Sequence, residues 1–279
     1  MKKLTILVAA AVAFALGSVS HASDTSIKLY ALDCGTINMF DIAPFSGEGH
    51  FENKPATLAD PCFLVRHPKG DFLWDAGLGD AIADMPEGKT EPWGHLTVKR
   101  KLSAQLKDLG LTPGDIDYLS LSHWHPDHSG NANLFAGATF IAQKNEHAFM
   151  FSDTMRAATD AFGVYSKLET ANTVQFGDAH DVFGDGSVVI HAALGHTPGH
   201  SILKLELENT GTVMFSGDLY IFEQSRTLGA VPSFNVDMAA TKISQAAFEA
   251  TAKAHSARVV IQHDMDHFKS LPAFPAFLD

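Results

Sequence analysis

The stretch that decides the fold reads Ser122-His123-Trp124-His125-Pro126-Asp127-His128-Ser129-Gly130. Three histidines and one aspartate fall within six positions, directly after an apolar run. His123 and His125 are two residues apart, so in an extended chain they point to the same side. Because Pro126 cannot continue a strand, we expect it to turn the chain and present Asp127 and His128 from a loop. Imidazole and carboxylate groups gathered in this way favour a borderline cation such as zinc, with iron or manganese as alternatives.

The chain begins with the features of a bacterial secretory signal peptide. Lys2 and Lys3 precede an apolar run over residues 4–17, and small residues follow near position 22. We therefore expect residues 1–22 to be removed, leaving residues 23–279 as a single domain in the periplasm or outside the cell. An uncleaved membrane anchor is the alternative, which the polar residues that follow directly disfavour.

Charge excludes two classes of partner. The formal net charge is −12, and loss of Lys2 and Lys3 with the signal peptide takes it to −14. An acidic protein of this kind lacks the electrostatic footprint of a nucleic-acid or anionic-membrane binder. The basic run Lys99-Arg100-Lys101 is interpreted as the solvated face of a helix.

The two cysteines, Cys34 and Cys62, leave two readings open. In an oxidising compartment they could form a disulfide. Each lies beside a strand-like run, and a chain of this length needs no covalent staple, which slightly favours two buried free thiols. Neither cysteine has the neighbours of a nucleophile or of a redox C-x-x-C motif.

Apolar periodicity predicts strands and helices that alternate along the chain. We expect helices near 96–109, 144–168 and 237–255, and long loops over 34–60 and 80–96. The strands are expected near 27–32, 62–66, 71–74, 116–121, 138–142, 173–176, 188–192, 202–207, 213–216 and 258–261. This order fits an α+β fold of two packed sheets with helices outside.

Three later strand ends carry residues of the same chemical kind as the first cluster. They are His200, after a Pro-Gly turn, Asp218, and His263. Each alone is a weak signal, but together with the first cluster they supply enough ligands for two metals. A histidine-rich polar turn is the alternative, and burying such a cluster without a cation would be costly.

The order His-x-His-x-Asp-His, Thr-Pro-Gly-His, Ser-Gly-Asp and a late histidine resembles the metallo-β-lactamase superfamily over essentially the whole mature chain. The resemblance implies an αββα sandwich with two divalent metals in a groove at one edge of its two sheets. Zinc is the expected metal, with iron, manganese or cobalt as alternatives. The implied first set is His123, His125 and His200, and the second is Asp127, His128 and His263, with Asp218 bridging. His196, together with His180, His191, His255 and His267, is then taken as a structural or surface residue.

Within the superfamily the chain looks most like the N-acyl homoserine lactonases, on the stretches 111–117, 129–131, 234–237 and 261–264. This implies quorum quenching by hydrolysis of a small-molecule lactone, in which a metal-bridging hydroxide attacks the carbonyl and Asp127 or Asp218 moves the proton. Such lactonases carry a tyrosine three residues after the bridging aspartate, where this chain has Ile221. Tyr220, one residue earlier, is the candidate oxyanion donor in its place, or that role is absent.

Rival functions use the same ligands. One is hydrolysis of another ester, namely an aryl ester, a phosphotriester or a β-lactam, although Asp218 stands where β-lactamases commonly have Cys or Ser. A mononuclear-iron persulfide dioxygenase is disfavoured by His128 and His263, and a non-catalytic metal-binding protein by the complete ligand set.

We expect an acyl tail among apolar residues of 36–60, 84–96 and 149–165. Asp75 is expected either to support a ligand histidine or to cap its strand, and a homodimer follows only by analogy.

Overall fold

The computed structural model describes residue 1 and residues 26–279, so beyond Met1 the expected signal peptide lies outside the described residues. Two sheets pack face to face, with strand orders β4-β5-β1-β2-β3-β6-β7-β8 and β13-β12-β11-β10-β9. The strands are β1 (Lys28–Met39), β2 (Ala56–His67), β3 (Gly70–Trp74), β4 (Lys89–Glu91), β5 (Gly94–Thr97), β6 (Tyr118–Ser120), β7 (Thr139–Gln143), β8 (Thr173–Phe176), β9 (Ala179–Asp181), β10 (Val188–Ala192), β11 (Ser201–Leu207), β12 (Gly211–Phe215) and β13 (Arg258–Val260).

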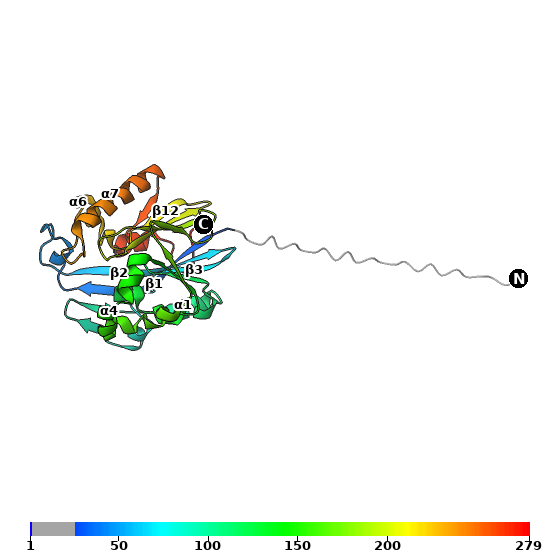
Figure 1. Ribbon diagram of the computed structural model, residues 1–279. Helices are drawn as coiled ribbons and strands as arrows, with labels where there is room; N and C mark the ends of the chain where they lie inside the picture. The colour runs from blue at the N-terminus through cyan, green and yellow to red at the C-terminus, as the bar shows by residue number, and fades with distance from the viewer. Residues whose placement is uncertain (2–25) are drawn as a thin grey trace.

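Helices cover the outer faces of the two sheets. The α-helices are α1 (Leu102–Asp108), α2 (Pro126–Ser129), α3 (Lys144–Met150), α4 (Asp153–Ala157), α5 (Thr159–Gly163), α6 (Glu223–Leu228), α7 (Met238–Ala254) and α8 (Met265–Ser270). Figure 1 shows α6 and α7 on one side of the strands and α1 and α4 on the other. The predicted αββα sandwich is therefore confirmed. None of the helices in the described part of the chain combines the length and apolarity needed to cross a bilayer.

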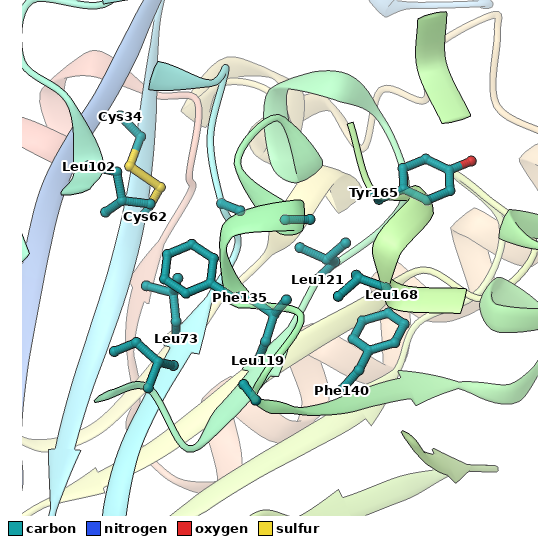
Figure 2. Packing of buried hydrophobic residues seen from close by; sticks show 14 of the residues in the cluster. Cys34, Cys62, Leu73, Leu102, Leu119, Leu121, Phe135, Phe140, Tyr165 and Leu168 are labelled. Atoms are coloured by element: carbon teal, nitrogen blue, oxygen red, sulfur yellow. A yellow bond between two sulfur atoms is a disulfide. The ribbon is translucent and has the colours of Figure 1, made fainter. Parts of the chain in front are cut away.

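Apolar side chains fill the space between the sheets and beneath the helices. Phe63 of β2 and Phe215 of β12 meet across the two sheets with ring centroids 4.4 Å apart. A second cluster lies between the larger sheet and its helices, where Figure 2 shows Phe135, Leu119 and Leu168 close together. Burial of this kind contributes about 1.5–3 kcal/mol for each large apolar side chain, which is what holds the strand ends in register.

The expected loops and helices differ from the structure at several boundaries. The loop expected over 34–60 is shorter, because β1 runs to Met39 and β2 begins at Ala56. These strands pair along their length with one irregularity between Asp33 and Thr36, so cross-strand hydrogen bonds override weak local propensity. The helix expected from residue 96 starts only at Leu102, because β5 pairs with β1 first.

The other two helix predictions fare better. The segment 144–168 is mostly helical, as predicted, but is divided into α3, α4 and α5 with a 3-10 turn (Ser166–Thr170) after them. The helix predicted over 237–255 is α7, and the Asp237 carboxylate accepts the N–H of Ala240 at 2.9 Å. This contact satisfies one of the free donors at the start of the helix, as an N-cap residue does.

Cys34 and Cys62 form a disulfide, so the slightly favoured prediction of two free thiols is wrong. The reason is strand register. Leu32 lies opposite Cys62, and the irregularity in β1 just after it brings Cys34 within 5.8 Å, measured between Cα atoms. This separation lies within the usual range for a bridged pair. Figure 2 shows the bridge beside Leu102 of α1.

Candidate metal centre

The His-x-His-x-Asp-His motif occupies the turn that follows β6. The strand ends at Ser120, and Pro126 is the first residue of α2, so the proline ends the extended stretch as the sequence predicts. His123 and His128 are buried, and the side chain of Asp127 is 23% exposed. The motif therefore follows a buried strand, and within it His125 and Asp127 are the ligand residues that keep partial contact with solvent.

Side chains from four separate turns converge here into two groups of potential metal ligands. In each group, one ligand atom per residue lies within 4.8 Å of the others. The first group contains His123, His125, His196 and Asp218, and the second contains Asp127, His128 and His263. All predicted ligands except His200 are thus brought together, and His196 is added.

The placement of His200 in the first set is wrong, as is the interpretation of His196 as a residue outside the site. His196 Nε2 lies 3.2 Å from His123 Nε2. Both nitrogens of His200 are engaged elsewhere, since Nδ1 lies 3.0 Å from the carbonyl oxygen of Ala193 and Nε2 accepts the backbone N–H of Asp218 at 2.9 Å. His200 therefore supports the loop that carries Asp218 and does not face the cluster. The Thr-Pro-Gly turn separates two histidines four positions apart, and nothing in the local sequence says which one faces inward.

The two carboxylate oxygens of Asp218 face different groups. Oδ1 lies 3.2 Å from Nε2 of His128 and 3.2 Å from Nε2 of His263, both of the second group. Oδ2 lies 3.4 Å from Nε2 of His196, in the first group. Oδ1 is also buried and has no hydrogen-bond partner among the residues that the structure describes. A buried unpaired carboxylate oxygen is costly, and a cation held by the second group would satisfy it.

Hydrogen bonds on the outer side of the rings set which nitrogen points inward. His196 Nδ1 lies 2.8 Å from the side-chain oxygen of Asn235, and His263 Nδ1 lies 2.8 Å from the carbonyl oxygen of Ala59. Both partners accept, so each Nδ1 carries the proton and each Nε2 directs a lone pair into the cluster. This is the arrangement that metal-binding histidines require.

His128 has the same orientation and meets His263 across the second group. Its Nδ1 lies 2.9 Å from the Asp75 carboxylate, and its Nε2 lies 3.1 Å from Nε2 of His263. Two inward nitrogens at this distance share either a proton or a metal cation. Burial alone would lower the pKa of His263, but the Asp218 carboxylate beside it raises that pKa to about 9. The group thus attracts positive charge, and the residues present fit a divalent metal.

Asp75 is the support of His128 that the sequence suggested as one of two readings. Its Oδ1 accepts the N–H of Ser122 at 2.6 Å, and its Oδ2 accepts from Nε2 of Gln262 at 2.7 Å. Gln262 in turn accepts from Nε1 of Trp74 at 2.9 Å. Asp75 is fully buried and has a φ of 60°, a conformation that costs a non-glycine residue about 1–3 kcal/mol. These hydrogen bonds hold the carboxylate against His128 in spite of that cost.

All ligands of both groups lie within one region of the chain that matches a family profile. The sequence matches the profile of the metallo-beta-lactamase superfamily over residues 58–263. The chain belongs to the metallo-β-lactamase superfamily. Its predicted class, a metal-dependent hydrolase of this superfamily, is confirmed.

Two relatives and one solved structure are similar to this chain over most of its length. The chain is 31% identical over 269 residues to the N-acyl homoserine lactonase AttM of Rhizobium radiobacter, and 29% identical over 272 residues to that of Azorhizobium caulinodans. These alignments cover 90% and 91% of this chain and 100% of each relative. A solved N-acyl homoserine lactone hydrolase, with N-hexanoyl-L-homoserine bound at its catalytic metal centre, has a TM-score of 0.75 and 23% identity, over 91% of this chain and 100% of that chain. At that identity the structural likeness shows the shared fold.

An apolar cavity opens beside both groups of this superfamily centre. Its volume is about 460 Å³, and His125, Asp127, Asp218 and His263 form its polar floor. The aromatic and branched side chains of its wall include Ile37, Phe40, Phe45, Leu58, Trp93, Ile221 and Phe234. The segments 36–60 and 84–96 therefore contribute as expected. Residues 149–165 do not line this cavity; Met150, Met155 and Tyr165 pack in the core instead.

Tyr220 points away from the cavity, so its predicted role as an oxyanion donor is wrong. Its side chain is 2% exposed, its ring packs against Phe248 of α7, and its hydroxyl forms a hydrogen bond with Glu249. Burial raises the pKa of the Tyr220 phenol further above its usual value. Ile221 lines the cavity at this level and offers no donor.

Proposed function

We propose that this protein opens the lactone ring of N-acyl homoserine lactones at a centre of two divalent metals, zinc being the expected ion. One observation carries the proposal: two groups of mostly buried ligands, both faced by Asp218, lie together and contribute His125, Asp127, Asp218 and His263 to the lining of an apolar cavity. A lactone head would meet the ligands, and an acyl chain would lie against the apolar wall. The names of the AttM relatives support the same substrate class.

The ligands form two sets, one for each metal ion. His123, His125 and His196 would hold one metal and Asp127, His128 and His263 the other, with one oxygen of Asp218 toward each. When bound, such metals lower the pKa of water toward neutrality and polarise an ester carbonyl. The neutral state of the first group is favoured, because burial lowers the pKa of His125 to about 3.

Proton transfer is assigned to Asp127. Lactone hydrolysis adds the oxygen of water to the acyl carbon, breaks the ring C–O bond and leaves an alkoxide that needs a proton. Asp127 lines the cavity and is the more exposed of the two carboxylates, with its Oδ2 3.7 Å from Nε2 of His263. Its carboxylate is placed to take the proton from water and pass it to the departing oxygen.

The apolar wall supplies binding and exclusion of water. Phe40 and Trp93 are about half exposed and line the cavity, where they would contact the part of an acyl chain furthest from the ring. Because residue 221 is isoleucine, no hydroxyl group at this position can donate a hydrogen bond to the substrate carbonyl. Aryl esters and phosphotriesters share these binding requirements and are the alternative substrates.

We also propose a periplasmic or secreted location. The first 22 residues have the pattern of a signal peptide, and the Cys34–Cys62 disulfide is a feature that persists in oxidising compartments. Fractionation of cells, with mass spectrometry of the mature N-terminus, tests this. Recovery of an uncleaved chain in the cytoplasm would contradict it.

A substrate panel on purified mature protein tests the function. Metal content is measured first, followed by proton release with homoserine lactones of several acyl lengths, an aryl ester, a phosphotriester and a β-lactam. We expect two metals per chain and the highest kcat/KM for acyl homoserine lactones. Two bound metals with no lactone turnover would overturn the proposed substrate, and a single iron with oxygen uptake on a persulfide would overturn the reaction class.

A further inference from the structure

Glu146, in α3, places a buried carboxylate between the two turns that carry the first ligand group. The residue is 2% exposed. Its Oε1 accepts the backbone N–H of Trp124 at 2.9 Å. Its Oε2 accepts the hydroxyl of Thr197 at 2.8 Å and the backbone N–H of Gly199 at 2.8 Å. Three donors from two turns thus meet one side chain.

Two of these donors belong to residues that are direct neighbours of metal ligands in the sequence. Trp124 stands between His123 and His125, and Thr197 directly follows His196. The single carboxylate therefore connects the backbone that carries two ligands to the backbone that carries the third. Hydrogen bonds to an ionised carboxylate are about twice as strong as neutral ones, so this link is stiffer than a neutral contact would be.

Close backbone approach shows that the link leaves little freedom. A Cβ added to Gly199 would lie 2.2 Å from the backbone nitrogen of Glu146 and 2.5 Å from the side-chain oxygen of Gln143. The turn therefore presses directly against the start of α3, and only glycine fits at this position. The hydrogen bonds that the structure gives the Glu146 side chain run to Trp124, Thr197 and Gly199, on the side of the first group.

We propose that Glu146 is a positioning residue that sets the spacing of His123, His125 and His196, and so controls the metal affinity of the first group without acting on the second. The inference rests on the two-metal centre of the proposed function. It adds a residue that contacts neither metal nor substrate. A residue needed only for folding would weaken both groups together, whereas a positioning residue weakens one.

The test compares Glu146→Gln with the wild-type full chain by zinc titration against a coloured chelator, with metal content after dialysis. Glutamine keeps the size but has one acceptor oxygen, and its amide group would face an N–H or O–H donor. We expect the affinity of one zinc to fall about 10- to 100-fold, as for loss of a partner of a metal ligand, while the other is unchanged. Burial raises the pKa of Glu146 to about 7, so about pH 8 keeps the carboxylate form dominant.

Cobalt loading identifies which group is affected. Loss of the absorption bands of the ion bound by the three-histidine group, with the other ion retained, is the expected signature. Glu169→Gln is the matched control, because it removes an exposed carboxylate that pairs with Arg156 on the surface. The control should bind both ions as the wild type does.

Two results would overturn the proposal: unchanged affinity for both ions in Glu146→Gln, or a parallel loss of both ions. If that variant does not fold, Thr197→Val removes one of the three hydrogen bonds and keeps the side-chain shape. It should show a smaller loss confined to the same ion, and an equal loss of both would contradict the proposal. No substrate enters these measurements, so failure to hydrolyse a lactone would overturn only the proposed function.

Discussion

The Oδ2 atom of Asp75 lies 2.9 Å from Nδ1 of His128, with both side chains buried at the junction of the two sheets. Asp75 directly follows β3 of the larger sheet, and Gln262, which donates to the same oxygen, follows β13 of the smaller one. The orientation of a predicted metal ligand therefore depends on how the two sheets pack. Partners of this type orient the ring and raise its basicity.

Replacement of Asp75 by Asn should weaken the second group selectively. The amide cannot accept from both Ser122 and His128, so His128 loses its fixed orientation. We expect the affinity of the second zinc to fall about 10- to 100-fold, with the first nearly unchanged. Zinc titration measures the change, and an equal loss at both groups would contradict this reading.

His196→Ala and His200→Ala should differ in kind. His196→Ala removes a ligand atom, so we expect one metal per chain in place of two. His200→Ala removes the acceptor of the Asp218 N–H and should lower metal affinity by about 10- to 100-fold while both metals still bind at saturation. Metal content after dialysis and kcat/KM at saturating zinc separate the two outcomes, and the reverse order would restore the assignment made from sequence.

Tyr220→Phe should leave catalysis almost unchanged. The hydroxyl bonds Glu249 behind the cavity, so its loss should cost about 1 kcal/mol of unfolding free energy and change kcat/KM by no more than about twofold, since a tenfold change would require about 1.4 kcal/mol at the transition state. Urea unfolding and lactone kinetics check both parts. A large fall in kcat with normal stability would return Tyr220 to the active site.

The Cys34–Cys62 disulfide should stabilise the fold measurably. It links residues 28 apart in sequence, and the loop-entropy relation for this length gives about 3–4 kcal/mol. The double variant Cys34→Ala/Cys62→Ala should have a free energy of unfolding lower by about 3–4 kcal/mol, measured by denaturant unfolding. Dithiothreitol should destabilise the wild type but not the double variant, and equal stability of the two proteins without reductant would contradict the estimate.

Metal removal should also lower stability, because the centre gathers buried carboxylates and inward-facing imidazoles. Zinc at about 100 times its dissociation constant adds about 2.7 kcal/mol for each site that binds only the folded state. A chelator should therefore lower the melting temperature, and added zinc should restore it. Asp218→Ala, which removes the residue that faces both groups, should respond far less to either treatment.

Local sequence was enough for much of the fold. The His-x-His-x-Asp-His spacing after an apolar strand and the stop at Pro126 placed four ligands at one turn, because strand periodicity and proline geometry act within a few residues. The cap of α7 by Asp237 is equally local. The arrangement as two sheets covered by helices followed from the order of apolar segments and from the family resemblance.

Three details depended on tertiary structure. His196 and His200 are four residues apart, and the contact of their turn with Glu146 and Asn235 decides which one faces the ligands. Tyr220 and Ile221 are adjacent, yet they point in opposite directions because α7 offers Phe248 and Glu249 on one side and the cavity lies on the other.

Cys34 and Cys62 are the third case, since they meet only through the register of β1 and β2. The chain by itself thus determined which residue types stand at the strand ends and in what order. Packing of distant elements decided which of two neighbouring side chains turns inward, because that direction is set by contacts and hydrogen bonds that no short stretch of sequence contains.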